Sequence, residues 1–180
     1  MLLLLACTTF TVNDDSGDSV GGTGDPSGDL DCDADYDFSE PAGPDCITGV
    51  LHCGDVIEGH TRGGSSGMDS EFYRSAFCFV PYTAYDGPER VYELELEADT
   101  EATVTLEAPC SDLGFAAARW SDEDVCPSGD DHAILDCNGA AADSVSDTKS
   151  NTFWAEKATR FIVAVDGASP AAYRLTVECE

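Results

Sequence analysis

Two groups of acidic side chains have a spacing that could bind calcium. The first places acids at positions 1, 3, 5, 7, 9 and 12 of a calcium loop: Asp29, Asp31, Asp33, Asp35, Asp37 and Glu40. Ala34 stands where that loop needs glycine for its sharp turn, so we predict a solvated acidic chain, with calcium as the alternative. The second group surrounds the segment between two cysteines: Asp122, Glu123, Asp124, Asp130, Asp131 and Asp136. Any specific calcium is expected there, because loops held by a disulfide lose less entropy on binding.

A Gly-x-Ser-x-Gly motif at residues 63–67, with Ser65 at its centre, could carry a nucleophile. A nucleophile elbow needs a strand before the serine, a helix after it, and an acid and a histidine further along the chain. His132 is the sole later histidine, and residues 63–67 are typical of a flexible loop, so we predict no catalytic site. His52, His60 and His132 are too scattered to predict a metal site.

The chain contains nine cysteines and no C-x-x-C pair. This usage favours disulfides in an oxidising compartment over zinc or a cytosolic redox site, and it indicates an exported protein. One cysteine must remain outside the disulfides, which leaves eight. Many pairings are open; we prefer Cys126–Cys137, Cys32–Cys46, Cys53–Cys179 and Cys78–Cys110, the first two because they close short loops.

The first seven residues explain the one cysteine that has no disulfide partner. Leu4, Leu5, Ala6 and Cys7 resemble a bacterial lipobox, in which an apolar approach and a small residue precede the cysteine that is acylated. Residues 1–7 are therefore predicted to be the end of a lipoprotein signal peptide, with Cys7 as the lipid attachment site. The membrane is then a partner through this anchor. Thr8 follows where an Asp would favour the inner membrane, so the resemblance implies the outer membrane.

Residues 8–45 contain eleven acids and no Lys or Arg, with Gly, Ser and Thr between them. Such a segment repels itself and cannot build a core, so we predict a disordered acidic tether. The whole chain has a formal net charge of −28, from eight Lys and Arg against 36 Asp and Glu. Binding to a phosphate backbone needs clustered cations, so nucleic acid is not expected as a partner.

Residues 46–180 alternate apolar and polar side chains, as strands with one buried face do. The clearest strands are predicted at 91–97, 102–106 and 173–177, and the first two are expected to pair as a hairpin. Further strands are predicted at 72–79, 113–120, 133–137, 152–155 and 159–165, and no segment has a helical period. The fold class is therefore all-β, an antiparallel sandwich stapled by disulfides.

Several motifs along residues 50–180 resemble the bacterial pre-peptidase C-terminal domain in its cysteine-rich form. They are Cys53-Gly54-Asp55, Gly87-Pro88-Glu89-Arg90-Val91-Tyr92, Ser111-Asp112-Leu113, Val163-Ala164-Val165-Asp166-Gly167 and Tyr173-Arg174-Leu175-Thr176-Val177. The chain departs from the family's Asp-Leu-Asp at Gly114. The resemblance implies a jelly-roll-like sandwich without catalytic activity, in a family whose members bind matrix polymers or assist secretion.

These observations predict a surface lipoprotein whose sandwich binds a protein or polysaccharide ligand. The alternatives are a structural subunit of a cell-envelope assembly and a secreted hydrolase. Trp120 and Trp154 are expected in the core or at its edge, with an aromatic platform for a glycan as the other interpretation. No cofactor is expected apart from the calcium discussed above.

Overall fold

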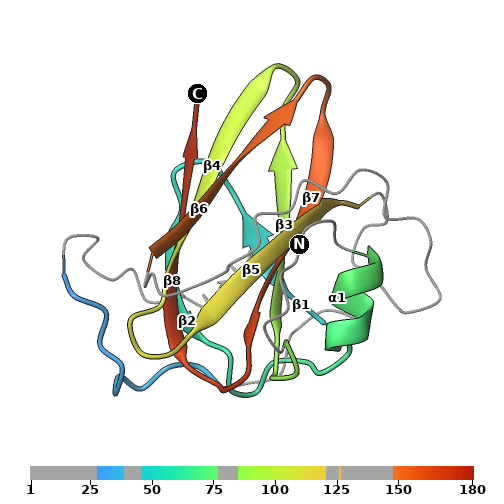
Figure 1. Ribbon diagram of the computed structural model, residues 1–180. Helices are drawn as coiled ribbons and strands as arrows, with labels where there is room; N and C mark the ends of the chain where they lie inside the picture. Colours follow the sequence, from blue (N-terminus) through green and yellow to red (C-terminus); the bar gives the residue numbers. More distant parts are fainter. Residues whose placement is uncertain (1–27, 39–45, 77–84, 121–125, 127–147) are drawn as a thin grey trace, which may run out of the picture.

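The computed structural model describes residues 28–38, 46–76, 85–120, 126 and 148–180. These residues form a sandwich of two four-stranded sheets, as expected (Figure 1). Sheet A contains, in spatial order, β1 (Ile47–Leu51), β3 (Arg90–Leu96), β7 (Thr159–Gly167) and β5 (Leu113–Arg119). Sheet B contains β2 (Val56–His60), β8 (Ala172–Cys179), β4 (Thr100–Glu107) and β6 (Thr148–Ala155).

The main core lies between the sheets and is built by alternating side chains. Leu94 and Leu96 of β3 face inward from sheet A, and Val104 and Leu106 of β4 face them from sheet B. A hydrogen bond of 2.5 Å between the buried hydroxyls of Tyr92 and Tyr173 also joins the two sheets.

A short helix replaces the strand that was predicted at 72–79. α1 spans Ser70–Ala76, and Asp69 caps its N-terminus by accepting a hydrogen bond of 2.8 Å from the Phe72 backbone N–H. Phe72 and its neighbour Tyr73 are both buried, which a strand facing one sheet could not achieve. Residues 77–79 and the strand predicted at 133–137 lie outside the described residues. No helix in the described part of the chain is long and apolar enough to span a membrane.

The hairpin predicted from the strands at 91–97 and 102–106 is wrong. β3 pairs with β1 and β7 in sheet A, whereas β4 pairs with β6 and β8 in sheet B. The turn between them contains Asp99 with a φ of 59°, and it carries the chain across the sandwich. β1 and β3 are parallel, which corrects the expectation of purely antiparallel strands.

Three disulfides are formed by the described cysteines, with Cα–Cα distances of 5.4 to 5.7 Å: Cys32–Cys110, Cys46–Cys126 and Cys53–Cys179. The predicted Cys53–Cys179 bond is therefore present, and it joins the turn before β2 to the end of the neighbouring strand β8. The predicted pairs Cys32–Cys46, Cys126–Cys137 and Cys78–Cys110 are wrong, because each would use a half-cystine bonded elsewhere. Cys78 and Cys137 themselves lie outside the described residues. The observed bonds connect positions 78 to 126 residues apart that the fold brings together, so short loops do not decide the pairing.

Candidate binding surface

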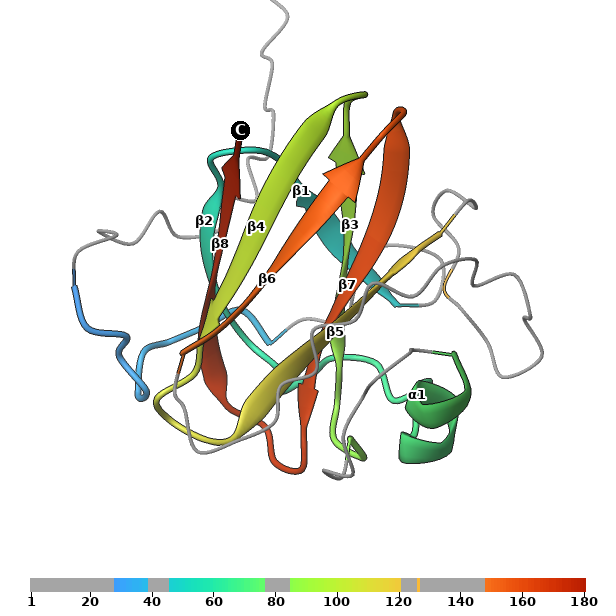
Figure 2. The ribbon, with the colours of Figure 1, turned by 45° about the horizontal axis from the view of Figure 1, so that its top comes forward.

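The two sheets differ in how much of their surface is covered. The outer face of sheet A is buried under α1 and its flanking segments, in a second apolar cluster with Phe72, Tyr73 and Trp120. β7 consequently has seven consecutive buried residues at its end, Phe161 to Gly167. Figure 2 shows β2, β8, β4 and β6 side by side, with α1 away from them beside sheet A. Among the described elements, no helix or strand covers the outer face of sheet B.

The outer face of sheet B carries a regular array of hydroxyl side chains. Register aligns them in two neighbouring cross-strand rows, Thr152–Thr103–Glu178 and Ser150–Thr105–Thr176–Val56. Same-face neighbours lie about 6.7 Å apart along a strand and about 4.8 Å apart across strands. Thr103 and Thr152 share a hydrogen bond of 3.0 Å between their hydroxyls. None of the other three hydroxyls bonds to another described residue, so they are open to solvent or ligand.

Trp154 stands at one end of this array. Its side chain is 48% exposed, and it lies on β6, the edge strand of sheet B, directly opposite Glu101 of β4. Thr152 is the next outward-facing residue on the same strand. An indole exposed to this degree gains stability from contact with a partner's apolar surface, while its N–H can donate a hydrogen bond. We call the surface formed by Trp154 and the five hydroxyl residues the hydroxyl face.

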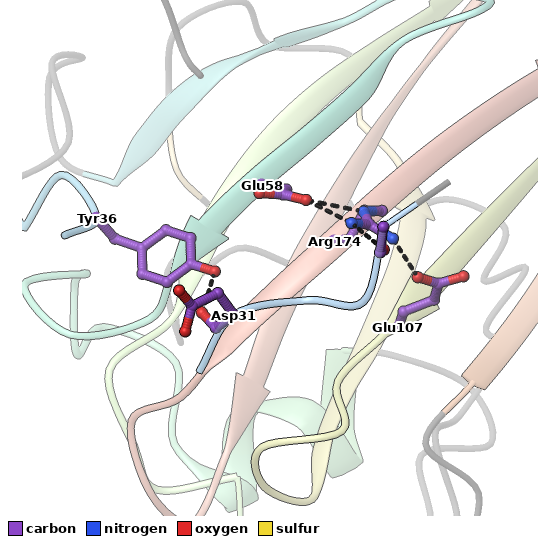
Figure 3. A network of polar contacts seen from close by, with 6 residues as sticks. Asp31, Tyr36, Glu58, Glu107 and Arg174 are labelled. Carbon is purple, nitrogen blue, oxygen red and sulfur yellow. Dashed lines mark hydrogen bonds and ion pairs between the residues drawn. The ribbon is translucent and has the colours of Figure 1, made fainter. Parts of the chain in front are cut away.

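The other end of sheet B is closed by a network around Arg174 (Figure 3). The Arg174 guanidinium donates to Glu58 at 2.6 and 3.0 Å, to Glu107 at 3.0 Å and to the Gly28 carbonyl at 2.9 Å. The hydrogen bond with Glu58 is the main reason that the pKa of Arg174 is raised. The Arg174 guanidinium is thus bonded within the chain and is not available to bind an anion at this end of sheet B.

Residues 28–38 lie against the sandwich, although we expected them to belong to a disordered tether. Cys32 is bonded to Cys110, Leu30 is buried, and the Tyr36 hydroxyl donates to the Asp31 carbonyl at 2.6 Å. Phe38 packs edge-on against His60, with ring centres 5.2 Å apart. Burial is the main cause that lowers the pKa of His60. We call residues 28–38 the N-terminal strap.

The predicted calcium ligands of the strap do not converge. Asp31 instead accepts a hydrogen bond of 3.0 Å from the Asp33 backbone N–H, and the side chains of Asp29, Asp35 and Asp37 are exposed. In the described ranges, no three His, Cys, Asp or Glu side chains are grouped as metal ligands. Outside the described residues lie Glu40, the predicted lipid attachment site Cys7, and the second predicted group of Asp122, Glu123, Asp124, Asp130, Asp131 and Asp136.

A buried acidic pair lies beneath α1 on the outer face of sheet A. Extending the register of β3 and β7 by one position puts Glu89 opposite Asp166, and both are fully buried. Glu89 Oε1 accepts hydrogen bonds from the Ser65 hydroxyl and from two backbone N–H groups, so Glu89 holds the 65–68 segment in place. Burial raises the pKa of Asp166 to about 7. Ser65 is therefore engaged with a buried acid, and the 63–67 motif shows no nucleophile elbow.

The two tryptophans have different environments. Trp120 is only 2% exposed in the cluster beneath α1, so it belongs to the core as expected, whereas Trp154 is on the surface. A platform made from both is therefore wrong. The hydroxyl face was not predicted, although the alternation of Thr103 with Thr105 and of Ser150 with Thr152 was a usable signal.

No protein-family model and no curated protein matches the sequence. Solved structures with a similar chain course include the pre-peptidase C-terminal domain of a Bacillus anthracis collagenase, with 14% identity, a TM-score of 0.46, and coverage of 75% of this chain and 97% of that one. Another is the periplasmic lysozyme inhibitor PliG of Aeromonas hydrophila, with 9% identity, a TM-score of 0.38, and coverage of 79% and 100%. A third is CorA, a surface-associated copper-binding protein of Methylomicrobium album BG8, with 8% identity, a TM-score of 0.41, and coverage of 75% and 99%. At TM-scores below 0.5, these likenesses carry no argument about ligand or activity.

Proposed function

We propose that this chain is a lipid-anchored cell-surface protein whose sandwich binds a ligand without catalysis, through the hydroxyl face. The observation that carries this proposal is the contrast between the two sheets. The outer face of sheet A is largely covered by α1 and its flanking segments, whereas no described helix or strand covers the polar side chains and the exposed indole on the outer face of sheet B. A surface built on paired strands suits ligand binding, because the sheet holds these side chains in position before the ligand binds.

The arrangement of reactive groups supports binding over hydrolysis. Ser65 donates its hydroxyl to Glu89, and the His60 imidazole accepts a hydrogen bond of 2.9 Å from the Arg62 backbone N–H through Nδ1. The acids at the margin of the hydroxyl face, Glu101 and Glu178, are both exposed. General acid–base catalysis needs a positioned side chain, and no described residue holds either carboxylate in place, so this face has the chemistry of a contact surface.

The anchor is supported by the cysteine count. The three observed disulfides use six of nine cysteines, and a fourth bond between Cys78 and Cys137 would leave Cys7 alone. Cys7 is also the cysteine that follows the lipobox-like Leu4-Leu5-Ala6. Several acyl chains on one cysteine hold a protein stably at a membrane, at about 0.8 kcal/mol per buried CH₂.

The anchor is tested by labelling producing cells with a clickable fatty acid. We expect label on the wild-type chain and none on the Cys7→Ser variant, which should leave the membrane fraction. Equal labelling of the two chains would refute the anchor.

The binding surface is tested by coating beads with the soluble chain and measuring their adhesion to cells of the producing bacterium and to its extracellular matrix. Trp154→Ala should reduce adhesion. Val50→Ala is the matched control, because Val50 is 46% exposed but lies on β1 of sheet A. Equal adhesion of the two variants would refute the hydroxyl face as the binding surface.

A further inference from the structure

We infer that the ligand of the hydroxyl face is an uncharged polysaccharide, bound along the strands with a sugar ring on Trp154. This inference rests on the proposed function and names the ligand class. It follows from three properties of the face: its hydroxyl groups, its indole and its charge.

The hydroxyl groups match a polymer that repeats its own hydroxyls. Each Thr or Ser hydroxyl has one donor and two acceptor positions, so it can bond a sugar hydroxyl in either direction. The five such groups of the face occupy adjacent positions on β4, β6 and β8, within two rows. A polysaccharide repeats equivalent hydroxyls, so it can bond to these two rows at several places along its length. A protein ligand instead depends on donors or charges at fixed positions.

The indole supplies the apolar part of the contact. A pyranose ring has one face lined by C–H groups, and an exposed aromatic ring packs against such a face over a large area. Trp154 is the side chain of the face that can do this, and its position at the end of the hydroxyl rows lets one bound chain contact both. Its outward-facing neighbours Thr152 and Glu101 can accept hydrogen bonds from the same sugar.

Charge excludes anionic polymers. The margin of the face carries Glu101, Glu178 and Glu180, which are all exposed, and Arg174 is already bonded to Glu58 and Glu107. The chain as a whole has a formal charge of −28. A polymer of uronic acids, phosphates or sulfates would be repelled, so an uncharged polysaccharide is the complementary partner.

A single flat site of this size binds weakly, and anchoring compensates for that. Many copies held on one membrane contact one polymer at several points, so the later contacts form at a high effective concentration. A surface lipoprotein can therefore hold a polymer that the isolated domain binds weakly.

The ligand class is tested by affinity electrophoresis of the full soluble chain in native gels. The gels contain hydroxyethyl cellulose, galactomannan, dextran or, as the anionic comparison, alginate. We expect at least one uncharged polymer to retard the chain and alginate to have no such effect. Trp154→Ala should weaken binding to that polymer about tenfold, which equals about 1.4 kcal/mol. Thr105→Val should also weaken it, because the change removes one hydroxyl and keeps the branched side chain. Val50→Ala should bind as the wild type does.

Melting curves of each variant establish that it is folded, and all three sites are on the surface. Retardation by none of the uncharged polymers, or retardation that Trp154→Ala leaves unchanged, would overturn the inference. Stronger retardation by alginate would also overturn it. If these results came together with reduced adhesion of the Trp154→Ala beads, the ligand class would be wrong and the binding surface would stand.

Discussion

Replacing Asp166 by Asn should stabilise the protein, by an amount that grows as the pH rises from about 4 to 7 and is then constant. Burial raises the pKa of Asp166 from its ordinary value of 3.8 to about 7 in the folded state. Below about pH 4 the carboxyl is neutral in both states, and its ionisation costs nothing. Between pH 4 and 7 the unfolded chain loses this proton first, so stability falls, and above pH 7 the full difference applies. About three pH units at 1.36 kcal/mol each give a cost of about 4 kcal/mol.

Asn removes this cost and keeps the local geometry. Its carbonyl oxygen can still accept the hydrogen bond that Asp166 Oδ1 takes from the Gly167 N–H at 2.6 Å. Its NH₂ group takes the place of Oδ2, which accepts no close hydrogen bond from a described residue but lies near the Tyr73 hydroxyl, and Glu89 Oε2 is likewise buried without a partner. A donor in place of one buried acceptor oxygen, facing the other on Glu89, is therefore favourable.

The assay is urea unfolding of wild type and Asp166→Asn at pH 4, 6 and 8, with disulfides intact. We expect the two to be similar at pH 4 and the variant to be more stable by up to about 4 kcal/mol at pH 8. Glu178→Gln, a change at an exposed acid of β8, controls for the lost charge. A variant that is less stable at pH 8, or a difference that does not depend on pH, would refute the reasoning about Asp166.

Three further predictions concern the framework. Peptide mapping without reduction should find a bond between Cys78 and Cys137, because the proposed acylation of Cys7 would leave only these two cysteines to pair. A free thiol on either would contradict this pairing. Asp69→Ala should lower the free energy of unfolding by about 1 kcal/mol through the lost cap of α1, and Asp69→Asn should restore most of it. Phe161→Ala should lower the free energy of unfolding by about 3–5 kcal/mol, because the ring is fully buried and its centre lies 5.3 Å from that of the Phe153 ring. A much smaller loss in a denaturant titration would show that the ring is not packed.

The sequence predicted three strands of each sheet, β3, β5 and β7 in sheet A and β4, β6 and β8 in sheet B, and it missed the edge strands β1 and β2. Strand β4 alternates cleanly in burial, because one face meets the core and the other meets solvent, whereas β8 begins with four buried residues that include Arg174. Sheet A gives a weaker signal, since α1 and its flanking segments cover the second face. Glu93 illustrates this: alternation predicts an exposed glutamate, but the side chain is buried 3.9 Å from Arg160.

The errors have a common physical origin, which is that they concern contacts between segments distant in sequence. Residues 97–99 do not indicate whether the chain turns back to form a hairpin or crosses to the other sheet. That depends on the strands with which β3 and β4 pair, which are β7 and β8. Disulfide pairing depends on the same arrangement. α1 was missed because a helix of seven residues has too few turns to display a period. The hydroxyl face could be read only after the registers of β2, β4, β6 and β8 were known.

The Cys32–Cys110 bond determines where a mechanical load enters the domain. A cell held to a polymer by a protein anchored at Cys7 would pull on the chain ahead of the N-terminal strap. The force would reach Cys32 and pass through the sulfur atoms to the segment between β4 and β5, before it reached β1 or β2. Both of these are edge strands, so each is held to its sheet by the backbone hydrogen bonds of one side only. The bond therefore diverts tension from the strands that would yield first, so a reduced protein should detach under shear that the oxidised protein withstands.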